Sequence, residues 1–123
     1  MTGTLTWIAV GLLGAIGSWA RFKIGVLVAA RYPSSVPLGT LVVNLSGAFG
    51  LGLLVGLAVA GDALLLVGGG LLGSYTTFST WMVESQRLAD DGEWGPMLLY
   101  LLGSMLAGLA AAGLGWLIGG AIS

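Results

Sequence analysis

The chain lacks the residues on which most enzyme chemistry depends. Its 123 residues include no cysteine and no histidine. This excludes disulfides, thiolate nucleophiles, imidazole bases and the usual transition-metal sites. Because no common nucleophile–base pair can be assembled without them, we expect a protein that is not an enzyme.

Charge is also scarce. Only 7% of the residues are charged and 57% are hydrophobic, whereas soluble domains carry about 25% charged residues. The mean hydropathy is +1.03. A net charge of −1 offers no basic patch for nucleic acid. So little charge cannot cover a water-facing surface, and the composition therefore predicts an integral membrane protein.

Four apolar stretches are long enough to cross a bilayer, which takes roughly 20 residues. They cover about residues 5–30, 38–60, 63–88 and 96–122, in a single domain of 1–123. Pro33 and Pro37 end the first, because proline breaks a helix interior. Gly61-Asp62 is expected to form a short turn that makes spans two and three antiparallel neighbours. Residues 1–20 have no basic region ahead of the apolar stretch, so no cleaved signal peptide is expected.

Small residues recur at a spacing of four, which suits close contact between membrane helices. The pairs are Gly14 and Ser18, Gly52 and Gly56, and Gly115 and Gly119. Tyr100 and Ser104 continue the stripe of the last pair along the fourth span. A plain packing face is the favoured interpretation for the glycines, and four short helices enclose so little that a dimer is expected.

The third span carries the most unusual sequence. Glycines at 68–70 and at 73 predict a broken helix, because glycine holds a helix poorly. A break exposes carbonyls that suit a cation and N–H groups that suit an anion. Residues 76–81 then bring four hydroxyls and two aromatic rings, Phe78 and Trp81, whose positive edges attract anions. The alternatives are a kink filled by its own hydroxyls and a purely core role for the rings.

Few other polar residues lie within the spans. Thr40 and Asn44 share one face of the second span, where the amide donors suit either an anion or an interhelical hydrogen bond. Arg21 needs a partner or an aqueous vestibule, or it snorkels to the interface. Glu84 and Arg87 are expected to pair at the end of the third span.

Three segments together resemble the Fluc (CrcB) family of bacterial fluoride channels. They are residues 14–22, residues 39–49, and Gly73 followed by 76–80. The resemblance implies an all-α protein of four transmembrane helices with a broken third helix, working as an antiparallel, dual-topology homodimer with two pores. It further implies passive export of fluoride across the bacterial plasma membrane, which protects against fluoride toxicity.

The resemblance also assigns residues. Backbone carbonyls of Gly73 and Thr76 would hold a structural Na⁺ at the dimer centre, and Glu84 would lie near the pore's end. Arg21 lies near the end of the matching first segment, and its candidate role in an anion vestibule comes from its place in the span. The implied fluoride pore comprises Thr40, Asn44, Phe78, Ser79, Thr80, Trp81, Tyr100 and Ser104. Trp81 stands where the family usually has a second phenylalanine, and its indole adds an N–H donor.

Other functions are weaker fits. A dual-topology small multidrug transporter needs a membrane-embedded carboxylate, and the first span has none. A structural membrane subunit would not need the hydroxyl-rich break. The four Lys and Arg residues fall towards one side of a four-span chain, which keeps a heterodimer with an oppositely biased paralogue open.

Overall fold

The protein is built from helices throughout the part of the chain that the structure describes. The computed structural model describes residues 3–33, 37–76 and 78–122, and the side chains of residues 78–80 lie outside that description. Its elements are α1 (Thr4–Arg31), α2 (Leu38–Gly56), α3 (Gly61–Ala63), the π-helix η1 (Leu64–Leu72), α4 (Gly73–Tyr75), α5 (Phe78–Asp90) and α6 (Trp94–Ile122). The all-α prediction is confirmed.

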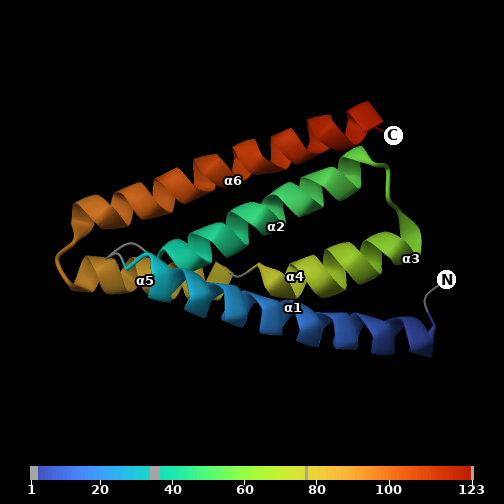
Figure 1. Ribbon diagram of the computed structural model, residues 1–123, viewed down its shortest axis with the longest axis horizontal. Helices are drawn as coiled ribbons and strands as arrows, with labels where there is room; N and C mark the ends of the chain where they lie inside the picture. The colour runs from blue at the N-terminus through green and yellow to red at the C-terminus, as the bar shows by residue number, and fades with distance from the viewer. Residues whose placement is uncertain (1–2, 34–36, 77, 123) are drawn as a thin grey trace.

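The chain passes back and forth along one long axis (Figure 1). Helix α1 leads away from the N-terminus and α2 returns. The run α3–η1–α4–α5 leads away again, and α6 brings the C-terminus back to the same end as the N-terminus. Helix α2 and the α3–α4 segment run in opposite directions, as expected for spans two and three.

Three helices are long and apolar enough to span a membrane: α1, α2 and α6. Their outward faces expose many large apolar side chains, Trp19, Leu106 and Leu117 among them. Within the described residues the buried hydrophobic side chains are few, namely Val43, Leu88 and Tyr100. Surfaces of this kind belong in lipid or against another membrane helix, and the protein is a multi-pass membrane protein.

Helices α2 and α6 pack together through glycine. Gly52 and Gly56 on α2 face Gly115 and Gly119 on α6, and a Cβ atom at any of the four would overlap backbone atoms of the other helix. At Gly119, for example, it would lie 2.6 Å from the Leu53 carbonyl oxygen. The prediction of a packing face is confirmed for these two pairs, which we call the α2–α6 seam.

The first predicted pair is only partly right. A Cβ at Gly14 would meet the Gly70 carbonyl oxygen at 3.9 Å, which is an ordinary contact. The close approach on α1 lies instead at Gly17, where a Cβ would overlap Ser74 and the Leu71 carbonyl. Helix α1 therefore packs against η1 and α4 through Gly17.

The expected turn is shifted. Gly61 and Asp62 open helix α3 rather than form the turn, and the connection lies at residues 57–60. Gly61 has φ +63, a left-handed conformation that glycine adopts without a Cβ penalty. The change of direction thus ends at Gly61 instead of beginning there.

The break does not lie in the glycine run 68–70 that was expected to cause it, but later, at Thr76. Residues 68–70 remain helical within η1, and Gly73 begins α4. The chain becomes extended at Thr76, with φ −77 and ψ 156. Glycines 68 and 70 serve close packing instead: a Cβ at Gly70 would lie 3.1 Å from the Val10 carbonyl oxygen on α1. The segment predicted as the third span is therefore divided into two helical pieces, residues 61–75 and α5, each shorter than α1, α2 or α6.

Candidate functional site

Polar side chains of α5 and α6 meet in two hydrogen-bonded pairs. The Trp81 Nε1–H donates to Ser104 Oγ at 2.8 Å. One turn along each helix, the Tyr100 hydroxyl donates to Glu84 Oε1 at 3.2 Å. Ser104 also donates back to the Tyr100 carbonyl oxygen of its own helix. These bonds position α5, the helix that follows the break at Thr76, against α6.

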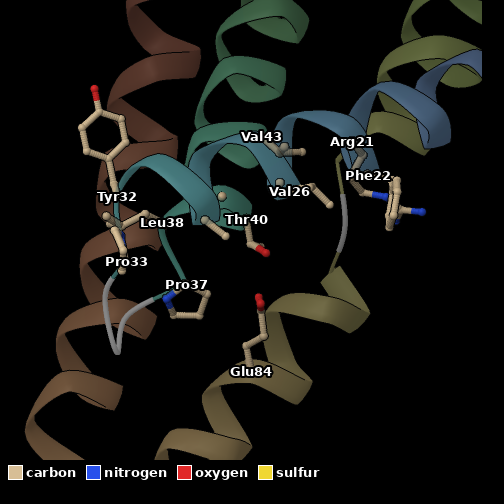
Figure 2. Close-up of a pocket in the computed structure, with 13 residues that line it drawn as sticks. Arg21, Phe22, Val26, Tyr32, Pro33, Pro37, Leu38, Thr40, Val43 and Glu84 are labelled. Carbon is tan, nitrogen blue, oxygen red and sulfur yellow. The ribbon is translucent and has the colours of Figure 1, made fainter.

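A cavity of about 660 Å³ opens where α1, α2 and α5 come together. Figure 2 shows Thr40 and Glu84 pointing toward each other across it, with Arg21 on the α1 side. Apolar side chains and prolines complete the wall, among them Phe22, Val26, Pro33, Pro37, Leu38 and Val43. Arg21, Thr40 and Glu84 therefore line one cavity at the end of the bundle.

Arg21 is half-buried and lines the 660 Å³ cavity. Its role in an anion vestibule stays a prediction. Glu84 is also half-buried and lies on the opposite wall. Its carboxylate accepts from Tyr100 on α6, whereas Arg87 is exposed. The prediction that Glu84 pairs with Arg87 is replaced by a bond between helices.

A smaller cavity of about 340 Å³ lies between α2 and α6. Tyr100 and Ser104 supply its polar side chains. The remaining lining residues are apolar: Leu38, Leu41, Leu99, Gly103 and Ala107. Leu38 lines both cavities, and Tyr100 donates to Glu84, a lining residue of the first. We call the polar groups of the two cavities the polar path; they are Arg21, Thr40, Glu84, Tyr100 and Ser104.

Asn44 lies one helical turn beyond Thr40 on α2. It is half-buried, makes an interaction of its own, and does not line either of the two cavities described above. Further along α2, a Cβ at Gly47 would overlap the Thr76 side chain, and the Ser46 and Tyr75 hydroxyls share a hydrogen bond of 2.8 Å. The α2 segment that carries Asn44 therefore leads directly to the break.

The break itself offers backbone carbonyls. The last carbonyls of a helix have no partner within it, and α4 ends at Tyr75. Leu72 O is taken by the Thr76 amide and hydroxyl, at 3.0 and 3.1 Å. Gly73, one residue later, is exposed. Oxygen ligands of this kind suit a hard monovalent cation such as Na⁺, and the sodium role of Gly73 and Thr76 stays a prediction.

The structure describes only some of the side chains that were predicted to line the pore. The side chains of Phe78, Ser79 and Thr80 lie outside the described part of the structure. Thr40, Trp81, Tyr100 and Ser104 are brought together by α2, α5 and α6. Sequence reasoning missed the two α5–α6 hydrogen bonds. The matching signal was present, since Trp81 and Glu84 are three apart and Tyr100 and Ser104 four apart, which puts each pair on one helix face.

Comparison with known proteins decides the family. The model of the CrcB-like proteins, described as "CrcB-like protein, Camphor Resistance (CrcB)", matches residues 8–116. The chain belongs to the CrcB family. The matched range contains every residue discussed above as part of the candidate site, from Arg21 to Ser104.

Similar curated members of the CrcB family extend over nearly the whole chain. A Mycobacterium tuberculosis protein named fluoride-specific ion channel FluC 2 is 51% identical over 109 residues, covering 89% of this chain and 86% of its own. The Moorella thermoacetica protein of the same name is 45% identical, covering 96% and 99%. A Thermus thermophilus fluoride-specific ion channel FluC is 41% identical, covering 94% and 96%.

Proposed function

We propose that this chain is a fluoride-selective ion channel that lets fluoride leave the bacterial cytoplasm passively across the plasma membrane. The observation that carries the proposal is the similarity to CrcB proteins named as fluoride-specific ion channels, at 41 and 51% identity over most of both chains. The multi-pass helical fold and the polar path through an apolar bundle support it. The chain is a channel and not an enzyme.

The polar path has the chemistry that a fluoride pore needs. Fluoride is small and strongly hydrated, so a narrow path must replace the lost water with hydrogen-bond donors and ring edges. Arg21 draws anions to the 660 Å³ cavity, where Thr40 offers a hydroxyl. Tyr100 and Ser104 offer hydroxyls further along. Asn44 and residues 78–81 complete the proposed pore.

Glu84 weakens the attraction of anions to the 660 Å³ cavity. Its carboxylate points toward Thr40 across the cavity whose wall also includes Arg21, so a negative charge opposes the positive one at this end of the bundle. A net positive mouth would hold anions tightly, and conduction requires that an ion leave as readily as it enters. We assign Glu84 the role of weakening anion retention at the pore's end.

The working unit that we propose is an antiparallel, dual-topology homodimer in which every chain crosses the membrane four times. The α3–α5 run supplies the remaining crossing as two half-helices. One chain leaves large apolar faces uncovered, and Gly73 at the break is exposed. Two breaks meeting at a two-fold axis would bring the Gly73 and Thr76 carbonyls around one Na⁺, which would neutralise the negative helix ends there.

Passive flux from liposomes tests the function. Purified protein is reconstituted into potassium fluoride-loaded liposomes, valinomycin starts the efflux, and an ion-selective electrode records it. We expect rapid fluoride efflux and little chloride efflux under the same gradient. Equal rates for the two ions, or no fluoride efflux, would refute the proposal. Proton-driven uptake of an organic cation into the same liposomes would favour the multidrug transporter instead.

A further inference from the structure

Trp81 provides a hydrogen bond that a phenylalanine at the same position cannot. Its Nε1–H donates to Ser104 Oγ at 2.8 Å and so links α5 to α6. Both residues are half-buried. The bond joins two residues of the proposed pore, so its effect falls on the ion path and not on a remote part of the bundle.

The Ser104 hydroxyl accepts from Trp81 and donates its one proton within its own helix. A serine hydroxyl has one proton to donate and two lone pairs that accept. Trp81 occupies a lone pair, while the proton goes to the carbonyl oxygens of Tyr100 or of Leu101, the latter at 3.2 Å. Back-bonds of this kind add little to a helix whose carbonyls already accept amide protons. The hydroxyl can turn its proton elsewhere and keep the bond from Trp81.

The space beside Ser104 offers the proton another acceptor. Ser104 and Tyr100 are the polar side chains of the 340 Å³ cavity, and its other walls are apolar. An anion that enters this cavity has few donors to replace its water, so the Ser104 hydroxyl becomes one of its main partners. Hydrogen bonds in a chain polarise one another, and a hydroxyl that accepts an N–H donates more strongly.

We infer that Trp81 is a positioning residue that strengthens Ser104 as a donor, through the chain Trp81 N–H to Ser104 O–H to fluoride in the 340 Å³ cavity. The inference rests on the proposed function and concerns how tightly one step of the path holds the ion. Tighter retention lowers the fluoride concentration needed for half-maximal current. It also slows release, so the tryptophan favours occupancy over maximal rate.

Current through single channels in planar bilayers, measured against fluoride concentration, separates these two quantities. Trp81→Phe should raise the half-saturating fluoride concentration about threefold, as expected when one bond of a polarised chain is lost, while the maximal current does not fall. Replacing Trp81 by benzothienylalanine, which has the shape of tryptophan but no N–H, should have the same effect. In a Ser104→Ala background, Trp81→Phe should change nothing further, whereas Ser104→Thr should preserve the threefold shift.

Several results would overturn the inference. An unchanged half-saturation in both Trp81 variants would do so, as would a threefold shift that persists in Ser104→Ala. Trp116→Phe is the matched control, because Trp116 lies on α6 with 54% of its surface exposed and should leave the curve unchanged. If the unmodified chain carries fluoride and only the Trp81 shift is missing, the proposed function stands. If it carries none, both fail.

Discussion

The α2–α6 seam allows a sharp test of the fold, because two glycines of the same helix differ only in what lies beside them. A Cβ at Gly115 would overlap the Phe49 carbonyl oxygen and lie 2.9 Å from the Leu53 amide nitrogen. Both are backbone atoms of α2 and cannot swing aside. At Gly113 a Cβ would meet nothing within 4 Å. We therefore compare Gly115→Ala with Gly113→Ala.

The magnitude follows from this difference. Both substitutions gain the same helix preference of alanine over glycine, about 0.8–1 kcal/mol, so that term cancels between them. Gly115→Ala additionally forces α2 and α6 apart, and overpacking of this kind costs about 1–3 kcal/mol. We expect Gly115→Ala to be less stable than Gly113→Ala by that amount, which is a factor of about 5 to 150 in the unfolding equilibrium.

Unfolding of the purified protein in mixed micelles, titrated with SDS and followed by circular dichroism, measures the difference. Gly52→Ala on the facing helix should behave as Gly115→Ala does, since its Cβ would overlap the Ala112 carbonyl. The two changes together should cost less than their sum, because helices already separated have room for the second methyl. Equal stability of the Gly113 and Gly115 variants would show that α2 does not lie in backbone contact with Gly115.

Four further outcomes are expected. Asn44→Asp should abolish fluoride efflux from liposomes without changing elution on gel filtration, and normal efflux would make Asn44 a packing residue. Phe78→Ile should slow efflux roughly tenfold if a ring edge supplies about 1.4 kcal/mol to the passing ion; an unchanged rate would remove Phe78 from the pore. Tyr100→Phe should lower stability to SDS by about 1.5–3 kcal/mol, because it removes a donor from the Glu84 carboxylate. In Asp91→Cys, a membrane-impermeant maleimide should label about half of the sites in intact cells and the other half only after permeabilisation. Labelling from one side alone would exclude dual topology.

Composition and periodicity were sufficient for the helical layout. Pro33 and Pro37 sit where α1 gives way to α2, as expected of residues that break a helix. The spacing of Gly52 with Gly56 also predicted the packing face, since backbones can approach only where side chains are missing. These features depend on local sequence, which a single chain reveals.

The third span was harder, because glycine has two uses that the sequence does not separate. It weakens a helix, and it also admits a neighbouring backbone. Gly70 serves the second use beside Val10, while the break falls at Thr76. The partners of Glu84 and Trp81 were missed for a related reason. Each pairs with a residue of α6, and such contacts depend on the relative rotation of two helices.

The break at Thr76 has a consequence for how the protein is made. The helical run before it covers residues 61–75 and α5 covers Phe78–Asp90, and a segment needs roughly 20 residues to cross the hydrocarbon core alone. In a chain of four crossings, neither piece can partition from the translocon into lipid by itself. Helices α1 and α2 leave the ribosome first and present the surfaces, at Gly17 and Gly47, that receive the segment. Insertion of the ion-path region thus follows the assembly of its neighbours, and the orientation of a newly made chain is decided before its pore exists.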